Sequence, residues 1–208
     1  MDFESLIFDI DGTLWDSRAL VAIGYNAQMK DEGLERLSVD VDILKAVFGK
    51  TMTEIADILF AELPAADRYP LMERCMARET QTLHENACRI GFPKVKETLE
   101  ELHKKHRLFI VSNSQSGYPQ LCMEKMGLGH LISGHLCFGD TGTCKGETIK
   151  RLMRENGITA ACYIGDTLGD QEAAALAGIP FVYCAFGFGQ VTDYWKKIEA
   201  FEELLNLQ

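Results

Sequence analysis

Short runs of apolar residues alternate with amphipathic segments along most of the chain. Runs that are apolar on both faces are typical of parallel strands covered by helices on each side. The runs are Leu6-Ile7-Phe8, Leu108-Phe109-Ile110-Val111, Leu136-Cys137-Phe138, Ala161-Cys162-Tyr163-Ile164 and Phe181-Val182-Tyr183-Cys184. Together they predict an α/β fold with a doubly wound, parallel, five-strand Rossmann-like sheet.

The stretch from residue 16 to residue 86 interrupts this alternation. It has helical periodicity and no convincing strand, so we expect residues 16–86 to form a small all-helical domain inserted after the first strand. Residues 1–15 and 87–208 would form the α/β core domain. Helical patterns lie in the core at Val95–His103, Pro119–Met126, Glu147–Glu155 and Asp170–Ala177, and in the insert at Leu20–Met29, Val41–Val47, Met52–Leu63 and Tyr69–Leu83.

Polar residues follow three of the apolar runs directly. The first run ends in Asp9 and Asp11, the second in Ser112-Asn113-Ser114, and the fourth in a segment that contains Asp166 and Asp170. The carboxyl ends of neighbouring parallel strands share one edge of a sheet, where open α/β sheets bind ligands. We therefore expect these side chains to converge on one site. Lys145, just ahead of a helical pattern, would add positive charge to it.

The pair Asp9 and Asp11 is the most informative part of this set. Two carboxylates placed so close together repel each other, and a bound cation would relieve that repulsion. A carboxylate at this place can be a nucleophile, a metal ligand or a proton-transfer group, and a pair can divide those roles. The alternative is that these are ordinary turn residues, since Asp and Gly are common after strands.

The ordered set of motifs resembles the haloacid dehalogenase superfamily of aspartate-nucleophile hydrolases. The set comprises D-x-D-G-T at residues 9–13, a hydroxyl residue closing a strand at Ser112, the lone Lys145, and G-D-x-x-x-D at residues 165–170. The helical insert lies where this superfamily has its small helical cap. The chain is most similar to the phosphoglycolate-phosphatase-like and beta-phosphoglucomutase-like branch, which implies the strand order 5-4-1-2-3.

The resemblance implies a role for each carboxylate. Asp9 would be the nucleophile that attacks phosphorus and forms an aspartyl-phosphate intermediate. Asp11 would protonate the leaving oxygen and then take a proton from the hydrolytic water. Asp9, the main-chain carbonyl of Asp11, and Asp166 would bind Mg²⁺, and Asp170 would ligate the ion or orient its ligands.

The resemblance also implies a set of phosphate-binding residues. Ser112 and Lys145 would hold the phosphoryl oxygens, because phosphoryl transfer depends mostly on positioning and charge stabilisation. Gly12 and Thr13 would let the backbone turn sharply and present amide groups. Asn113, beside Ser112, would either contact the same phosphate or cap its loop.

Two further glycine segments resemble nucleotide-binding motifs only in part. Gly49-Lys50-Thr51 lacks the first glycine of a P-loop, since position 44 is Leu44. In the capped branch this region resembles the loop that faces the active site, so Lys50 would either meet a second anionic group of the substrate or be a solvated lysine. Gly187-Phe188-Gly189 lacks the third glycine of a dinucleotide motif and predicts a tight structural turn.

The function implied by the resemblance is a Mg²⁺-dependent phosphatase that hydrolyses a phosphomonoester of a small phosphorylated metabolite. Asp11 argues against dehalogenation, because the dehalogenases of the superfamily lack an acid two residues after the nucleophile. A sugar-phosphate mutase would use the same residues and return the phosphoryl group to a substrate hydroxyl, so it stays an alternative. A binding module without turnover is a further alternative, which the intact set of acids and Lys145 disfavours.

The composition of the chain indicates which binding partners and which cellular compartment to expect. The formal net charge is −10 and no block of Lys or Arg stands out, which disfavours nucleic-acid binding. No apolar run approaches the ~20 residues that span a bilayer, so no membrane partner is expected. Seven cysteines, an odd number without C-x-x-C spacing, indicate reduced thiols in a cytoplasmic protein. We expect a monomer, with a dimer as the alternative.

Overall fold

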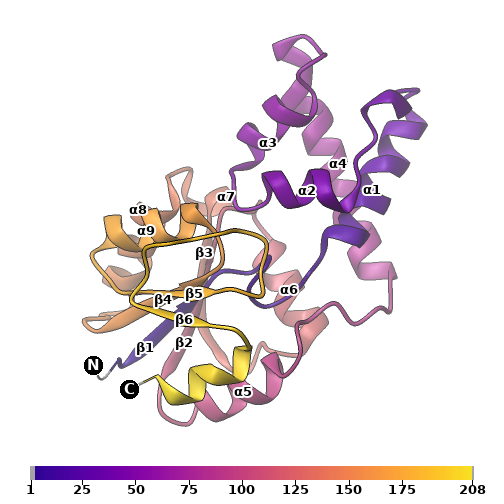
Figure 1. Ribbon diagram of the computed structural model, residues 1–208. Coiled ribbons are helices and arrows are strands. Elements are labelled where there is room, and N and C mark those ends of the chain that lie inside the picture. The colour runs from indigo at the N-terminus through magenta and orange to yellow at the C-terminus, as the bar shows by residue number, and fades with distance from the viewer. Residues whose placement is uncertain (1–2, 208) are drawn as a thin grey trace. The chain divides into compact units, whose positions relative to one another are not determined.

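The computed structural model describes residues 3–207 and divides into two compact units. Ser17–Arg89 form the helical unit, and the described residues on either side of it form the sheet unit (Figure 1). The sheet unit contains β1 (Ser5–Phe8), α5 (Val95–Leu102), β2 (Arg107–Ser112), α6 (Tyr118–Met126), β3 (Ile132–Cys137), α7 (Phe138–Thr141), α8 (Lys145–Glu155), β4 (Ala161–Gly165), α9 (Leu168–Ala177), β5 (Phe181–Cys184), β6 (Lys196–Ile198) and the 3-10 helix η2 (Phe201–Asn206). The helical unit contains α1 (Arg18–Asp31), the 3-10 helix η1 (Glu35–Leu37), α2 (Val41–Val47), α3 (Met52–Leu59) and α4 (Ala65–Glu85).

The sheet has the order β3-β2-β1-β4-β5-β6, and every neighbouring pair is parallel. The predicted α/β fold is confirmed, and the five predicted strands have the expected order. The sheet has a sixth strand, however, where the sequence pattern predicted five. Lys196–Ile198 contains two lysines in three residues, so it carries no apolar run, and it pairs at the edge beside β5.

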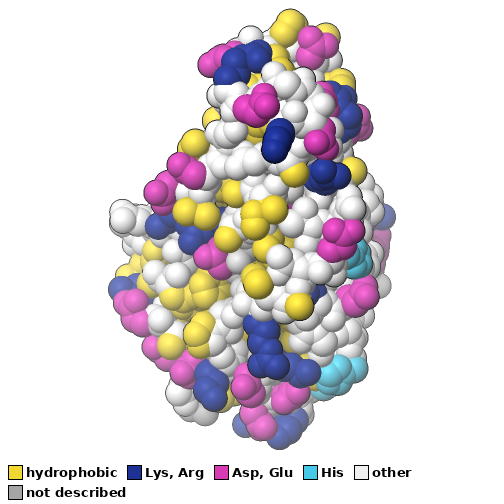
Figure 2. Space-filling view, turned by 90° about the vertical axis from the view of Figure 1, so that its right-hand side faces the viewer, with side chains coloured by type: hydrophobic (Ala, Val, Ile, Leu, Met, Phe, Trp, Pro, Cys, Tyr) yellow, Lys and Arg dark blue, Asp and Glu magenta, His cyan; other side chains and the backbone are white. Residues whose placement is uncertain are grey.

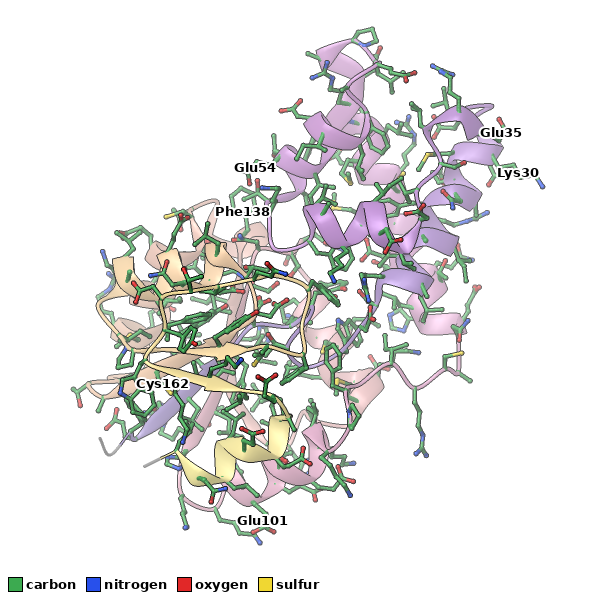
Figure 3. The ribbon with its side chains drawn as sticks, viewed as in Figure 1. Lys30, Glu35, Glu54, Glu101, Phe138 and Cys162 are labelled. Carbon is green, nitrogen blue, oxygen red and sulfur yellow. The ribbon has the colours of Figure 1, made fainter. Side chains whose placement is uncertain are left out.

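The third strand also differs from its prediction. Its apolar run was expected at residues 136–138, whereas β3 spans Ile132–Cys137 and Phe138 begins the short helix α7 (Figure 3). Most of β3 is only partly buried, because it is an edge strand with Ser133, Gly134 and His135 in its middle. A half-covered strand does not show the continuous apolar pattern of the central strands.

Helices cover both faces of the sheet (Figure 1). Alternate residues of a strand face opposite ways, and those of β1 and β2 divide accordingly. Ile7 and Phe109 pack with Ile149 of α8 in one buried cluster, on the side of α8 and α9. Phe8 contacts Phe201 of η2, with ring centroids 6.0 Å apart. The central strands are therefore buried on both faces, and their carboxyl ends lie along one edge of the sheet.

The helical unit has an apolar core of its own. Tyr25 and Met29 of α1, Leu44 of α2, and Phe60 and Met72 pack together in it. Helices α1 and α4 pack very closely at Gly24, where a Cβ atom would lie 3.0 Å from the Glu79 Cα. Helix α3 begins with a capping box in which Thr51 and Glu54 each form a hydrogen bond with the other's backbone amide.

Two structural observations test the expectations about membrane and nucleic-acid binding: the hydropathy of the described helices and the charge on one face of the protein. Within residues 3–207, no helix has both the length and the hydropathy that crossing a bilayer requires. On the face shown in Figure 2, Lys and Arg side chains are interspersed with Asp and Glu. This face therefore carries no single block of positive charge.

Candidate active site

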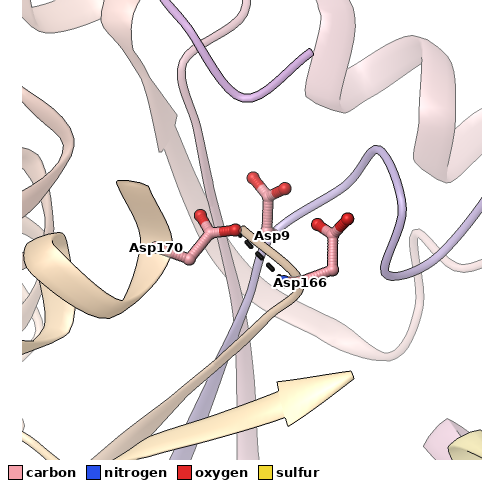
Figure 4. Close-up of side chains that lie close together, drawn as sticks. All are labelled: Asp9, Asp166 and Asp170. Atoms are coloured by element: carbon pink, nitrogen blue, oxygen red, sulfur yellow. Dashed lines mark hydrogen bonds between the residues drawn. The ribbon is translucent and has the colours of Figure 1, made fainter. Parts of the chain in front are cut away.

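Three buried carboxylates meet at the carboxyl ends of β1 and β4 (Figure 4). The register pairs Phe8 with Ile164, and the Asp9 amide donates to the Ile164 carbonyl at 2.9 Å. Asp9 therefore leaves β1 at the level where β4 ends and the Asp166 turn begins. One oxygen from each of Asp9, Asp166 and Asp170 lies within 4.8 Å of the others.

Lys145 lies against two of these carboxylates. It is the first residue of α8 and is 4% exposed. Its Nζ atom donates to Asp9 Oδ1 at 2.8 Å and to Asp170 Oδ1 at 2.6 Å. Charge-assisted bonds of this kind are stronger than neutral ones, and burial removes the water that would weaken them. The predicted approach of Lys145 to the acidic residues is thus present in the structure.

The electrostatics of this cluster show an excess of negative charge. Burial raises the pKa of Asp9 to about 7, although Lys145 lowers it, and Asp170 and Asp11 raise it further. Burial also raises the pKa of Asp166 well above its usual range, with added repulsion from Asp170 and Asp9. Burial alone would lower the pKa of Lys145, but Asp170 and Asp9 outweigh this and raise it. One lysine therefore does not balance three acids.

Asp170 serves as an internal support for the site. Its Oδ2 accepts from the Asp166 amide at 3.1 Å, the bond drawn in Figure 4. The same oxygen accepts from the Thr167 amide at 2.9 Å and the Thr167 hydroxyl at 2.7 Å, and Oδ1 accepts from Lys145. Thr167 caps α9 in return, in a capping box with Asp170. With both oxygens engaged, Asp170 is better suited to orienting Lys145 and the Asp166 turn than to direct metal ligation.

Asp166 has one engaged oxygen and one that is buried without a partner. Its Oδ2 accepts from the Phe188 amide at 2.6 Å. Its Oδ1 accepts no hydrogen bond from any residue that the structure describes. A buried carboxylate oxygen without a donor costs free energy unless something else binds it. A divalent cation fits this place, because hard cations prefer oxygen ligands and would oppose the excess negative charge.

The Gly187-Phe188-Gly189 turn, which the sequence predicted to be a tight structural turn, is also a part of the site. At Gly187 a Cβ atom would lie 2.3 Å from the Asp166 Cβ and 2.5 Å from the Gly12 carbonyl oxygen. At Gly12, whose φ is +84°, a Cβ would lie 2.2 Å from Asp166 Oδ2. The two glycines thus let three turns approach each other around Asp166. The sequence places this turn directly after the fifth strand, at the same sheet edge as the acids, and this position could have assigned the turn to the site.

Asp11 lies outside the cluster of three carboxylates. Its Oδ1 accepts from Trp15 Nε1 at 2.8 Å and from the Tyr118 hydroxyl at 3.0 Å. The side chain of Asp11 therefore has surroundings different from those of Asp9, as the proposed division of roles between the two acids requires. Neither Trp15 nor Tyr118 was identified from the sequence, because both types are ordinary core residues.

The remaining predicted residues lie in different places. Ser112 ends β2 and is buried, and its hydroxyl accepts from the Ser114 amide at 3.2 Å. Thr13 is buried in the turn after β1, and Asn113 follows Ser112 in the loop after β2. Lys50 is exposed and belongs to the helical unit. Phosphate binding by these residues stays a prediction.

Comparison with known proteins gives consistent matches. The family model of haloacid dehalogenase-like hydrolases matches residues 6–184. The chain is 28% identical over 204 residues to a phosphoglycolate phosphatase of Aliivibrio fischeri, covering 90% of this chain and 86% of the relative. It is 25% identical over 198 residues to a phosphoglycolate phosphatase of Aquifex aeolicus, covering 91% and 90%.

Solved structures have the same fold. A haloacid dehalogenase-like family hydrolase of Streptococcus pneumoniae superposes with a TM-score of 0.84 at 21% identity, covering 98% of this chain and 97% of the other. A haloacid dehalogenase-superfamily hydrolase of Geobacter sulfurreducens superposes with a TM-score of 0.74 at 20% identity, covering 99% and 96%. With the family model matching most of its length, the chain belongs to the haloacid dehalogenase-like hydrolases, as its motifs predicted.

Proposed function

We propose that this protein is a Mg²⁺-dependent phosphatase that hydrolyses a phosphomonoester of a small metabolite through an aspartyl-phosphate on Asp9. The observation that carries the proposal is the buried set of Asp9, Asp166 and Asp170 with Lys145 bonded to two of them. A nucleophile, fixed positive charge and oxygen ligands for a hard cation are the components that phosphoryl transfer needs. Relatives named phosphoglycolate phosphatase make phosphoglycolate the first substrate to test.

The residues divide the work of two successive displacements. Asp9 attacks phosphorus while the bond to the leaving oxygen breaks, and Asp11 gives its proton to that oxygen. Water then attacks the phosphoryl group on Asp9, Asp11 takes a proton from the water, and Asp9 is regenerated as free phosphate forms. Lys145 opposes the negative charge on the phosphoryl oxygens, with Ser112, Asn113 and the amides of the Gly12 turn as further donors.

A cation site completes this proposal. Asp9, Asp166 and the main-chain carbonyl of Asp11 would hold Mg²⁺, with Asp170 orienting the first two through its contacts with Lys145 and the Asp166 amide. Bound there, Mg²⁺ would supply positive charge opposite the phosphoryl oxygens. We further propose that the helical unit is the cap domain that selects the substrate, with Lys50 facing a second anionic group.

Phosphate release from a panel of phosphorylated metabolites tests the proposed function. We expect Mg²⁺-dependent hydrolysis of at least one of phosphoglycolate, sugar phosphates and nucleotides, and loss of that activity in EDTA with recovery on adding Mg²⁺. Activity that survives chelation would contradict the cation site. Isomerisation of a hexose 1-phosphate supplied with trace bisphosphate, without phosphate release, would show the mutase instead. No turnover of any member would favour a binding module.

Replacement of Gly187 by Ala tests the support of Asp166. The added methyl group would displace the Asp166 side chain, because no space exists beside its Cβ. We expect Gly187→Ala to weaken Mg²⁺ affinity by about 10–100-fold, the usual effect of disturbing groups that orient metal ligands. Titration calorimetry with Mg²⁺ alone, without substrate, measures this directly.

Gly129→Ala is the matched control for this substitution. A Cβ atom at Gly129 would have nothing within 4 Å, and its backbone lies outside the left-handed region. We expect Gly129→Ala to bind Mg²⁺ as the wild type does. Equal affinity of Gly187→Ala and the wild type would remove the Gly187 turn from the site.

A further inference from the structure

Two buried donors converge on one oxygen of Asp11. Trp15 Nε1 donates to Asp11 Oδ1 at 2.8 Å, and the Tyr118 hydroxyl donates to the same atom at 3.0 Å. Trp15 is fully buried and Tyr118 nearly so. Their rings meet edge to face, with centroids 5.5 Å apart and an interplanar angle of 78°. Each aromatic side chain therefore restrains the other as well as the carboxylate.

The two donors come from different elements, and both are fixed by the backbone. The Trp15 carbonyl accepts from the Gly12 amide at 2.9 Å, and Trp15 forms bridges with Asp11 and Gly91. Tyr118 is the first residue of α6, and its backbone amide donates a hydrogen bond to the Gln115 carbonyl at 3.3 Å. The Asp11 carboxylate is thus held between its own loop and the start of α6.

We propose that Tyr118 and Trp15 are positioning residues that hold Asp11 as the general acid of the first displacement. This proposal rests on the phosphatase function given above. An oxygen that accepts two hydrogen bonds has both lone-pair directions engaged, so Oδ2 is the atom that carries the transferable proton. General acid catalysis depends first on geometry, and two donors at Oδ1 fix the direction in which Oδ2 lies.

The proton transfer itself is also assisted by these donors. As the Asp9–phosphorus bond forms and the bond to the leaving oxygen breaks, the proton passes from Asp11 Oδ2 to that oxygen. Asp11 becomes a carboxylate, and the bonds from Trp15 and Tyr118 become charge-assisted at that moment. The two hydrogen bonds therefore stabilise Asp11 more strongly as its negative charge develops than before the reaction starts.

The leaving group distinguishes this role from a merely structural one. An alkoxide leaves poorly and needs the proton, whereas p-nitrophenolate is stable enough to leave without one. The value of kcat/KM reports steps up to release of the leaving group, so it isolates the first displacement. Loss of a positioning donor should lower kcat/KM for an alkyl phosphate much more than for p-nitrophenyl phosphate.

Tyr118→Phe is the decisive variant, because it removes the hydroxyl and keeps the ring. We expect kcat/KM for the best alkyl phosphate to fall about 10-fold or more, a part of the ~10²–10⁴-fold that general acids supply. The value for p-nitrophenyl phosphate should stay close to that of the wild type. Trp15→Phe should give the same split, and Tyr194→Phe, an exposed tyrosine of the same unit, should change neither value.

A double-mutant cycle completes the test. In an Asp11→Asn background, where the general acid is absent, Tyr118→Phe should have no further effect on the alkyl phosphate. Equal losses for both substrates, no loss for either, or additive effects in the cycle would overturn this proposal alone. A wild-type protein that hydrolyses neither substrate would overturn the proposed function as well.

Discussion

Asp9→Asn is expected to abolish phosphate release while leaving the fold intact. The amide has nearly the same shape as the carboxylate but cannot attack phosphorus, so the covalent step is lost. We expect kcat to fall by at least about 10⁴-fold, since removal of a catalytic nucleophile costs this much or more. Steady-state phosphate release on the best substrate measures the loss, and circular dichroism verifies the fold.

The intermediate gives a second measurement for the same variant. Acid-quenched wild-type protein should retain substrate-derived phosphate on Asp9, and Asp9→Asn should retain none. The matched control is Asp193→Asn, which changes an exposed Asp of the same unit and should keep wild-type activity. Residual turnover of Asp9→Asn above about 1% of the wild type would contradict the nucleophile assignment.

The acidic site could be predicted from the sequence because its residues are fixed by strand ends. Parallel strands place their carboxyl ends on one edge, so the residue that follows Phe8 at the end of β1 and the residue that follows Gly165 at the end of β4 are neighbours once the strand order is known. Asp9 and Asp166 follow directly from this rule. Lys145 was harder to place from its position alone, because it begins a helix on one face of the sheet and reaches the acids with its long side chain.

The supporting contacts could not be predicted in the same way. Phe188 contacts Asp166 through its backbone amide, and every residue except proline has such a donor, so the residue type does not indicate this role. Trp15 and Tyr118 contribute polar atoms from otherwise apolar side chains, so their patterns indicate only a core. Strand β6 was missed because pairing at a sheet edge depends on backbone geometry, which a short segment with two lysines does not reveal.

Lys145→Met is expected to lower both activity and stability. Methionine has similar length and no charge, so Asp9 and Asp170 would face each other in a buried place without their common cation. Removing one partner of a buried ion pair typically costs about 3–5 kcal/mol of unfolding free energy. Loss of charge stabilisation at the phosphoryl oxygens should lower kcat/KM by at least about 10²-fold.

The stability loss should depend on pH in a defined direction. The pKa of Asp9 in the folded wild type, about 7, already exceeds its ordinary value of 3.8. The folded state therefore binds more protons than the unfolded state between these values, and stability falls as pH rises through this interval. Without Lys145 to lower the pKa of Asp9, that fall should continue to higher pH. Urea denaturation in EDTA should show a larger loss for Lys145→Met at pH 8 than at pH 5.

Lys150→Met is the matched control, because Lys150 lies on the same helix, but its side chain is 41% exposed and its ion pair with Glu147 lies at the surface. Its effect on unfolding free energy should stay below about 0.5 kcal/mol at both pH values. Small and pH-independent losses in both variants would show that the Lys145 pairs do not govern the stability of the site. Added Mg²⁺ should recover part of the stability of Lys145→Met, because a cation beside Asp9 and Asp166 opposes the same repulsion. It should not restore turnover, because the Nζ donor directed at Asp9 would still be missing.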